Sequence, residues 1–494
     1  MDSRRNVRLS QIAQRLDRLG LLAGPAALSS DPVCTGCTDD SRRVRPGDLF
    51  CAVRGTRDDG HRYLKAAAGA GAVGALVEAV NPSFALPQVL VRDSRRATAH
   101  AAQVVFGDPG EGLTLIGVTG TNGKTTTVQI TRHLCSARGP AGSVGTLGVG
   151  TPDGGFADTG LTTPGPVEFT AAVAALRDAG ARTVVAEVSS HALRQSRVDG
   201  FSFDVAVFTN LTQDHLDYHT DTEDYRRSKL RLATLVRGDG TLVVNADDPA
   251  WAPLLEAQPR VETFGLRAHA RWRAEDVQLL PTGSRFRLHA PEGTARIELP
   301  LVGAVNVANA LAAAAAAGAV GLDVGTIAQR LANAPAVPGR LERLTETPVL
   351  VLRDYAHTAD AIARALAAVR PLTSGRVCIV FGAGGDRDRG KRPAMGRAAA
   401  EGADHCIVTS DNPRTEDPEA IVREIVAGLP DGTSYESIVD RREAIARALE
   451  RARPGDLVLL AGKGHETTQV VGERKIPFDE REIVRELLEG RGKA

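Results

Sequence analysis

Short apolar runs recur along this chain, and most are followed by a polar or glycine-rich turn and then by a segment with helical periodicity. Runs of this length, rich in Val, Ile, Leu and Phe, are typical of buried strands. Their alternation with helices predicts an α/β fold in which crossover helices cover parallel sheets. The predicted strands are residues 48–53, 88–92, 113–119, 183–187, 205–209, 241–245, 348–353, 376–381, 405–410 and 456–461.

Three other segments interrupt this alternation. An amphipathic helix is predicted over residues 12–22, a β-rich insert over about 261–301 and an alanine-rich helix over 305–317. Pro335 and the pair Pro338-Gly339 then mark a linker. We therefore predict three domains, at residues 1–108, 109–338 and 339–494.

Composition limits the classes of partner. Lys plus Arg and Asp plus Glu both total 60 in 494 residues, so no net charge favours nucleic acid or an anionic membrane. No apolar run reaches the ~18 residues of a membrane span, and the first residues lack the apolar core of a signal peptide. The six cysteines are scattered, and we interpret the lone CxxC of Cys34 and Cys37 as two incidental thiols rather than a zinc or redox site. We predict a cytoplasmic monomer that binds small molecules, with neither nucleic acid nor membrane as partner.

The most informative motif is GTNGKTT, which lies between the predicted strand 113–119 and a helical segment over 126–137. A glycine-rich turn in this context lets backbone N–H groups surround phosphate oxygens. Lys124 can then reach the outer phosphates, and the Thr125 hydroxyl can bind Mg²⁺. The motif is compact, because Val118 stands where a full Walker A pattern has Gly. The alternative is a glycine turn beside a surface lysine. The predicted nucleotide-binding residues are Gly120, Thr121, Asn122, Gly123, Lys124, Thr125 and Thr126.

Polar residues follow the next two predicted strands. Glu187 ends one strand and can hold Mg²⁺, although a strand-terminal Glu exposed to solvent is the alternative. Ser189, Gln195 and Arg197 on the following loop could bind an acidic substrate. His215 follows the other strand and could bind a second metal ion, although a lone His is more often a structural hydrogen-bonding group.

Further along the chain, isolated polar residues allow several interpretations. Lys229 on a helical pattern would by itself be interpreted as a surface lysine. Asn306 at the start of the alanine-rich helix is ordinarily a cap, but its amide could also bind adenine. Arg340 could stabilise charge that develops in phosphoryl transfer, and Asp354 could accept a hydrogen bond from a ribose hydroxyl.

Three loops of the last region follow predicted strands, and such loops meet at one edge of a parallel sheet. They are the glycine-rich loop 382–393 with Arg387, the DNPR sequence at 411–414 and the GKGHE sequence at 462–466. Together they offer Arg for a carboxylate and Asp or Glu for an ammonium group. This combination is what a zwitterionic amino acid requires.

The ordered motifs of the chain closely resemble those of the Mur ligase family. The resemblance runs from about residue 38 to residue 466 and includes TTP at 162–164, EVSSH at 187–191, NLTQDHLDYH at 210–219, YRRSK at 225–229, NVANALAA at 306–313, PGRLE at 338–342 and DYAHT at 354–358, besides the motifs above. It implies a three-domain Mur ligase architecture: an α/β N-terminal domain for a UDP-sugar, a central ATP-binding domain with a P-loop-type sheet, and a Rossmann-like C-terminal domain for an amino acid.

The resemblance also implies a reaction. The enzyme would phosphorylate the terminal carboxylate of UDP-N-acetylmuramoyl-L-alanyl-D-glutamate with ATP, and the amino group of meso-diaminopimelate would attack the acyl phosphate. By this resemblance Thr125 and Glu187 bind Mg²⁺, Lys229 is carbamylated and binds a second Mg²⁺ beside His215, and Lys124 assists phosphoryl transfer. Asn306, Arg340 and Asp354 match ATP contacts. The residues that match contacts to the UDP-muramoyl dipeptide are Ser41, Thr162, Thr163, Ser189, Gln195 and Arg197.

The amino-acid site implied by the resemblance comprises Arg387, Asp411, Asn412, Pro413, Arg414, Gly462 and Glu466. Arg414 favours meso-diaminopimelate, because a second carboxylate at the far end of the substrate suits a bidentate Arg. Addition of L-lysine or L-ornithine by the same chemistry stays an alternative. More distant alternatives are an enzyme similar to folylpolyglutamate synthase, which shares the phosphate loop but lacks the DNPR sequence, and a P-loop ATPase without ligase activity.

Overall fold

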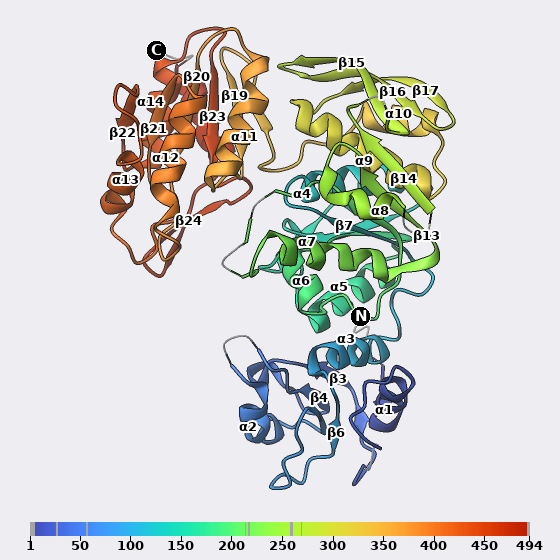
Figure 1. The fold of residues 1–494 in the computed structure, drawn as a ribbon. Helices are drawn as coiled ribbons and strands as arrows, with labels where there is room; N and C mark the ends of the chain where they lie inside the picture. Colours follow the sequence, from blue (N-terminus) through green and yellow to red (C-terminus); the bar gives the residue numbers. More distant parts are fainter. Residues whose placement is uncertain are drawn as a thin grey trace. The chain divides into compact units, whose positions relative to one another are not determined.

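A computed structural model describes residues 5–25, 28–55, 58–212, 214–215, 218–256, 260–267 and 269–491. Its α/β architecture agrees with the predicted fold class (Figure 1). The chain divides into two compact units: residues up to 273 with 290–292 and 311–327, and residues 274–289, 293–310 and 328 onwards. The three proposed domain ranges stay a prediction.

The first unit begins with a small parallel sheet. Its strands are, in spatial order, β3 (Gly36–Thr38), β4 (Asp48–Cys51), β5 (Gly74–Val77) and β6 (Gln88–Leu90). Helices α1 (Leu9–Arg18) and α3 (Ser94–Val105) pack on one face, and α2 (Leu64–Gly69) packs on the other. Helix α1 ends before the predicted residue 22, because Gly20 has a φ of +64°, a conformation that terminates helices. A short pairing of β1 (Val7–Arg8) with β2 (Val33–Cys34) completes this region.

A larger sheet follows in the same unit. From one edge its strands are β10 (Phe156–Ala157), β9 (Gly148–Gly150), β8 (Ala141–Gly145), β11 (Thr183–Glu187), β7 (Thr114–Thr119), β12 (Phe203–Phe208), β13 (Val236–Asn245) and β14 (Arg260–Gly265). The strands from β8 to β14 are parallel. Because β7 lies between β11 and β12, the segments that follow these three strands meet at one edge. This order places the phosphate loop beside Glu187 and residues 209–212.

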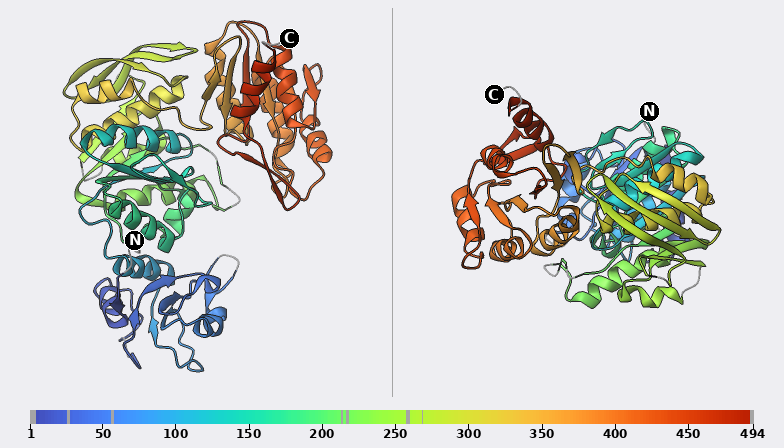
Figure 2. Two further views of the ribbon diagram at one scale, coloured as in Figure 1. Left: turned by 180° about the vertical axis from the view of Figure 1, so that it is seen from behind. Right: turned by 90° about the horizontal axis from the view of Figure 1, so that it is seen from above.

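Helices cover both faces of the larger sheet (Figure 2). They are α4 (Lys124–Cys135), α5 (Pro166–Asp178), α6 (Ser190–Arg194), α7 (Thr222–Leu230) and α8 (Ala252–Leu255). Helix α4 packs on β8 and β11, whereas α5, α6 and α8 share a core with alternate strand residues such as Val184, Ala186 and Phe208. Val167 and Ala174 of α5 also join the core of the N-terminal sheet. The two sheets of the first unit therefore share one hydrophobic contact region.

The predicted β-rich insert consists of β15 (Trp272–Leu280), β16 (Gly283–Ala290) and β17 (Gly293–Leu299). The alanine-rich segment forms α9 (Ala304–Ala319), and α10 (Val324–Leu331) follows it. Ala312, Ala314 and Ala316 are fully buried. The structure confirms the long helix and the β-rich insert, but the insert was predicted to start at about residue 261, and residues 261–265 belong to β14 of the parallel sheet.

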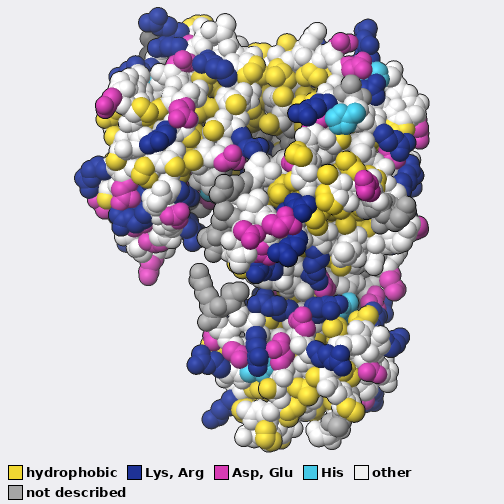
Figure 3. Space-filling model, viewed as in Figure 1, with side chains coloured by type: hydrophobic (Ala, Val, Ile, Leu, Met, Phe, Trp, Pro, Cys, Tyr) yellow, Lys and Arg dark blue, Asp and Glu magenta, His cyan; other side chains and the backbone are white. Residues whose placement is uncertain are grey.

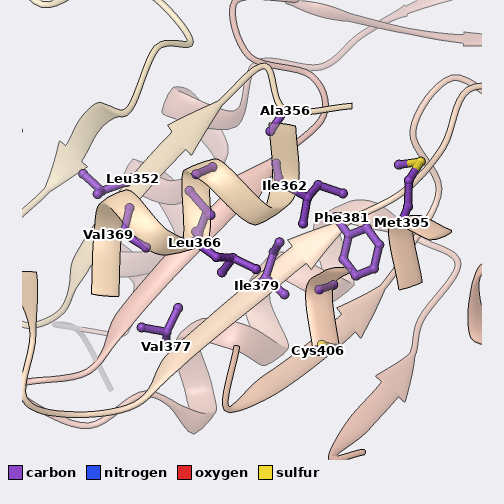
Figure 4. Close-up of a cluster of buried hydrophobic side chains, with 14 of the residues drawn as sticks. Leu352, Ala356, Ile362, Leu366, Val369, Val377, Ile379, Phe381, Met395 and Cys406 are labelled. Atoms are coloured by element: carbon purple, nitrogen blue, oxygen red, sulfur yellow. The ribbon is translucent and has the colours of Figure 1, made fainter. Parts of the chain in front are cut away.

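The second unit contains a further sheet, in the order β18 (Glu342–Thr345), β19 (Leu350–Asp354), β23 (Leu457–Ala461), β20 (Val377–Phe381), β21 (His405–Val408) and β22 (Tyr435–Ser437). All neighbours are parallel except β18 and β19. Alternation along each strand assigns Leu352, Ile379 and Phe381 to the core with α11 (Ala359–Val369), α12 (Lys391–Gly402) and α13 (Pro418–Val426) (Figure 4). The other face packs against α14 (Arg441–Arg451) and α15 (Glu480–Arg491).

A hairpin of β24 (Thr468–Val471) and β25 (Arg474–Pro477) lies outside this sheet. The strand order brings together the carboxyl ends of β19, β23, β20 and β21. The loops that carry Tyr355, Lys463, Arg387 and Asp411 follow these strand ends. They therefore lie at one edge of the sheet, as predicted from the sequence for the three loops 382–393, 411–414 and 462–466.

Basic and acidic side chains intermingle over the surface visible in Figure 3, which agrees with their equal totals. Among the residues that the structure describes, no helix is long and apolar enough to cross a membrane.

Candidate functional site

The phosphate loop requires glycine at two positions. Gly123 adopts a φ of +82° and caps α4, which therefore begins at Lys124, two residues before the predicted start. Gly120 has a φ of +148°, and a Cβ there would lie 1.9 Å from the Thr209 hydroxyl oxygen. Side chains at these positions would distort the loop, which leads directly into α4.

The loop is held in place by residue 210, which follows β12. The Asn210 carbonyl oxygen accepts a hydrogen bond from Thr121 N at 2.7 Å, and its Oδ1 accepts one from Asn122 N at 2.9 Å. Lys124 Nζ donates to the carbonyl oxygens of Gly120 and Thr121 at 2.9 and 2.7 Å. The cation thus lies over the loop, where the phosphates of a nucleotide would provide oxygen acceptors.

Glu187 is buried, with an exposed fraction of 1%, so the alternative of a solvent-exposed strand terminus is wrong. Its Oε2 accepts hydrogen bonds from the hydroxyl groups of Thr125 and Thr146, both at 3.1 Å, and its Oε1 accepts one from Thr146 N at 2.8 Å. Sequence reasoning missed Thr146, although it directly follows β8, the neighbour of β11. The carboxylate and the Thr125 hydroxyl supply the oxygen donors that Mg²⁺ prefers.

Lys229 is likewise buried, with an exposed fraction of 1%, so its interpretation as a surface lysine is wrong. Its Nζ donates to the Gly120 carbonyl oxygen at 2.7 Å and lies 4.5 Å from the centre of the Tyr225 ring. Burial, followed by the nearby charge of Lys124, lowers the pKa of Lys229 well below its usual range. The uncharged amine is therefore favoured, and this form is the nucleophilic one.

His215 has a φ of +54°, and its imidazole ring packs edge-on against that of His191, with ring centres 4.8 Å apart. Its Nε2 lies 3.6 Å from Asp214 Oδ2, and its ring centre is 6.2 Å from that of Tyr225. His215 and Lys229 therefore both lie beside Tyr225. Gln213, Leu216 and Asp217 of the same motif lie outside the described residues. Sequence reasoning did not single out His191, which belongs to the EVSSH motif.

The residues assigned to an acidic substrate form a continuous hydrogen-bonded series. Thr163 Oγ1 donates to the Glu187 carbonyl oxygen at 2.8 Å and accepts a hydrogen bond from Ser189 N at 3.1 Å. Arg197 donates to the Thr163 carbonyl oxygen at 2.6 Å and to Gln195 Oε1 at 2.9 Å.

Thr162 links this series to Glu187, the candidate Mg²⁺ ligand. The Thr162 hydroxyl lies 3.1 Å from the hydroxyl of Thr146, which in turn donates to Glu187. Ser41 begins a short 3-10 turn, Ser41–Arg43, whose preceding residue Asp40 caps it. The structure thus places five of the six predicted dipeptide contacts along one edge of the larger sheet. Ser41 lies in the N-terminal sheet region of the same unit.

The remaining ATP candidates belong to the second unit. Asn306 is buried, and its Nδ2 donates to the Val302 carbonyl oxygen at 2.9 Å. The Arg340 guanidinium lies 5.0 Å from the centre of the Tyr355 ring. Asp354 Oδ2 accepts a hydrogen bond from Leu341 N at 2.8 Å, and burial raises the pKa of this carboxyl group.

The DNPR and GKGHE loops contact each other directly. Asn412 Nδ2 donates to Glu466 Oε2 at 2.8 Å, and Arg414 Nη1 donates to the Gly385 carbonyl oxygen at 2.6 Å. Gly385 belongs to the loop that also carries Arg387. Three loops separated by tens of residues in the sequence therefore form one polar cluster.

Asp411 is buried, and within the described part of the chain no hydrogen-bond donor reaches its Oδ2 atom. Gly462 has a φ of +113°, and a Cβ there would lie 2.7 Å from this oxygen. A side chain at Gly462 would therefore collide with this carboxylate. A buried carboxylate oxygen without a donor suits a cationic ligand group.

Cys34 and Cys37 are free and buried, and burial raises the pKa of Cys34 to about 11. Within the described ranges, no cluster of three or more His, Cys, Asp or Glu side chains could hold a metal ion. Nothing here changes the interpretation of the CxxC as incidental thiols. The proposed Mg²⁺ site at Glu187 and Thr125 does not require such a cluster, because phosphate oxygens and water supply the other ligands of the ion.

Comparison with known proteins gives matches over nearly the whole chain. Residues 118–317 match the Mur ligase middle domain, and residues 339–464 match the Mur ligase, glutamate ligase domain. The UDP-N-acetylmuramoyl-L-alanyl-D-glutamate–2,6-diaminopimelate ligase of Gloeobacter violaceus is 46% identical over 460 residues, which cover 92% of this chain and 94% of that protein.

Solved structures give a similar result. A structure of a ligase of the same name is 32% identical, has a TM-score of 0.69, and is matched over 99% of this chain and 100% of that chain. A Mur ligase from Thermotoga maritima in complex with ADP is 20% identical, with a TM-score of 0.63 and 93% and 98% coverage, and supports the fold.

Proposed function

Because the chain belongs to the Mur ligase family, we propose that it is the ligase that adds meso-diaminopimelate to UDP-N-acetylmuramoyl-L-alanyl-D-glutamate in peptidoglycan biosynthesis. The reaction uses ATP and releases ADP and phosphate. The proposal rests on relatives more than 40% identical over most of the chain and on one structural observation, the unpaired buried Oδ2 of Asp411 in the same polar cluster as Arg414.

The chemistry follows from the poor reactivity of a carboxylate towards an amine. Transfer of the terminal phosphoryl group of ATP to the substrate carboxylate gives an acyl phosphate, which has a good leaving group. The amino group then attacks the carbonyl carbon, the C–O bond to phosphate breaks, and the amine loses a proton. Donors placed where negative charge develops contribute most to such steps.

In this proposal the first unit carries the phosphoryl-transfer residues. The loop from Gly120 to Thr126 binds the phosphates, Lys124 exchanges its carbonyl contacts for phosphate oxygens, and Thr125 with Glu187 holds Mg²⁺. Bound Mg²⁺ supplies charge neutralisation for the transferred phosphoryl group. Thr162, Thr163, Ser189, Gln195 and Arg197 bind the muramoyl dipeptide, together with Ser41.

We further propose that Lys229 is carbamylated. Its buried amine, which a lowered pKa keeps uncharged more readily, can attack CO₂, form an N–C bond and release one proton, which converts a neutral amine into a carboxylate-like anion. That anion and His215 would hold a second Mg²⁺. The burial of the amine and its position beside the phosphate loop support this role.

The second unit carries the amino-acid site. Arg414 and Arg387 bind carboxylate groups, and Asp411 with Glu466 binds an ammonium group. Asn306, Arg340 and Asp354 are proposed as further ATP contacts. L-lysine and L-ornithine have no second carboxylate for Arg414 to bind, so Arg414 favours meso-diaminopimelate.

The test is release of phosphate from ATP in the presence of the UDP-muramoyl dipeptide, with meso-diaminopimelate, L-lysine and L-ornithine offered separately. Release that depends on meso-diaminopimelate alone is expected. Release with L-lysine or L-ornithine instead would keep the ligase chemistry and contradict the assignment of Arg414. Release that needs neither substrate would identify an ATPase and contradict the proposed function.

A further inference from the structure

Lys463 lies in the GKGHE loop directly after β23, and its side chain is fully buried. Its Nζ is 3.1 Å from Asn412 Oδ1 and 3.1 Å from Glu466 Oε2. The aromatic ring of Phe478 lies 6.0 Å from the same nitrogen. A lysine without solvent contact is rare, and its charge must be balanced by nearby acceptors.

Other buried cations of the second unit have different partners. Arg441 is also fully buried, and its guanidinium pairs with Glu480 at 2.8 Å and with the Ala461 carbonyl oxygen at 2.9 Å. None of these partners is assigned to a substrate. Both side-chain partners of Lys463, in contrast, are residues of the proposed amino-acid site.

Lys463 and the backbone N–H of Val470 together fix the orientation of the Asn412 amide. Asn412 Oδ1 accepts hydrogen bonds from Lys463 Nζ at 3.1 Å and from Val470 N at 2.9 Å. An ammonium group and a backbone N–H can only donate, so the oxygen of the amide must face them. The Asn412 Nδ2 group is consequently directed at Glu466 Oε2, to which it donates at 2.8 Å.

Lys463 also determines which Glu466 oxygen remains for a ligand. Glu466 Oε2 accepts hydrogen bonds from both Asn412 Nδ2 and Lys463 Nζ. The carboxylate is thereby anchored through one oxygen, and the Glu466 side chain stays one-third exposed. The second oxygen, Oε1, is the one that the Asn412–Lys463 pair leaves unused.

We propose that Lys463 is a positioning residue for the incoming amino acid. It holds Asn412 and Glu466 in one arrangement, so that Glu466 Oε1 and the nearby Asp411 carboxylate together receive the substrate ammonium group. Lys463 does not contact the substrate itself. This inference rests on the proposed function, because it assigns the three-loop cluster to the amino acid.

The experiment compares Lys463→Met with Arg441→Met in the full-length protein. Arg441→Met is the matched control, because it also removes a fully buried cation from the same unit but leaves Asn412 and Glu466 paired with Lys463. The measurements are kcat and the KM values for meso-diaminopimelate and ATP, together with the melting temperature. Lys463→Met should raise the KM for meso-diaminopimelate by about tenfold, equivalent to roughly 1.4 kcal/mol, and leave the KM for ATP within about twofold.

A merely structural lysine would behave like Arg441, with a lower melting temperature and equal changes in both KM values. That result would overturn the proposal, as would an unchanged KM for the amino acid. If Lys463→Met does not fold, Lys463→Gln is tested alone and in combination with Glu466→Gln. The Lys463→Gln change should add little to the KM once Glu466→Gln is present, since its target is then lost, and additive effects would overturn the proposal.

The wild-type protein separates this inference from the proposed function. If it releases phosphate with L-lysine or L-ornithine rather than meso-diaminopimelate, the substrate assignment fails. The role of Lys463 is then tested by the KM for the accepted amino acid instead of the KM for meso-diaminopimelate. If it accepts no amino acid, both fail.

Discussion

The phosphate loop of the first unit and the three-loop cluster of the second unit satisfy their polar groups in different ways. In the first, Lys124 and Lys229 both donate to the same backbone carbonyl oxygen, that of Gly120. In the second, side chains pair with side chains across distant loops, as Asn412 and Lys463 do with Glu466. In the first arrangement the acceptors belong to the backbone of one local motif, whereas in the second they are side chains that the order of the strands brings together.

This difference has a consequence for specificity. A phosphate loop whose lysine binds the loop's own carbonyl oxygens can serve any reaction that consumes a nucleoside triphosphate. Such a loop therefore identifies only a broad class of protein. Among the described residues no hydrogen-bond donor reaches Asp411 Oδ2, and a cluster of side chains that contains such a carboxylate oxygen has a charge that suits one class of ligand. Substitutions in the two regions should therefore affect different substrates.

The largest effect is expected for Lys229→Ala. Loss of the amine removes the proposed carbamate and the charge stabilisation that depends on it, worth several kcal/mol, so turnover should fall about 10³-fold. Short carboxylates such as formate or acetate should restore part of the phosphate release. Lys65→Ala, at an exposed lysine of α2, serves as a control. Turnover close to wild type would remove Lys229 from the mechanism.

Arg414→Ala should have the next largest effect and should act on the amino acid alone. Removal of a charge-paired Arg is expected to raise the KM for meso-diaminopimelate about 10²-fold, while the KM for ATP stays nearly constant. Steady-state kinetics with each substrate varied in turn measures both. Arg423→Ala, an exposed residue of α13, is the control. Equal increases in the KM values for meso-diaminopimelate and ATP would contradict the assignment of the two regions to different substrates.

A smaller effect is expected for Thr146→Val, which keeps the shape of the side chain and the backbone contact to Glu187 but removes the hydroxyl donor. Loss of one hydrogen bond to a carboxylate, worth roughly 1–2 kcal/mol, should lower kcat about tenfold. The KM for the amino acid should not change. Thr234→Val, at an exposed site of the same unit, is the comparison. A kcat unaffected by Thr146→Val would show that Glu187 needs no such support.

The smallest effect is expected for a substitution of Asp39. It tests whether the first unit also contains a partly buried carboxylate whose charge is not balanced by nearby cations or donors. Burial, followed by the charge of Glu168, raises the pKa of Asp39 to about 6. The pKa of an Asp in the unfolded chain is about 4, so the folded state binds the proton more tightly. The free energy of unfolding therefore falls as the pH rises from about 4 to about 6.

Asp39→Asn should therefore be more stable than the wild type at about pH 8, by a free energy of unfolding on the order of 1 kcal/mol. The difference should vanish well below about pH 4, where Asp39 is protonated in both states. Thermal unfolding at the two pH values measures this difference. A difference that persists at low pH would have another cause than ionisation.

Local patterns predicted most of the secondary structure. The strand at residues 183–187 was predicted with its observed bounds, because an apolar run between turn residues has few other solutions. Boundaries shifted where a glycine adopts a positive φ. Gly123 starts α4 earlier than predicted, and Gly20 follows the early end of α1.

The site was only partly predictable from the residues. Lys229 has the spacing of a surface lysine on a short helix, and only its burial against Tyr225 and the phosphate loop distinguishes it. Thr146 and Lys463 were not identified as site residues, because their partners Glu187 and Asn412 lie tens of residues away in the sequence. The site assignments taken from the family resemblance stay predictions until the variants are measured.

The sequence by itself determined the α/β class, the phosphate loop and the family, because these depend on periodicity and on motifs whose residues are adjacent in the chain. Only the tertiary structure decided which carboxylates are buried and which cations they face. Asp411 keeps an unpaired oxygen, whereas Glu466 is anchored by Lys463, although both follow strands and look alike in sequence. The reason is physical: burial and pairing arise from strands brought together by the order of the sheet, and this order is not a local property of the chain.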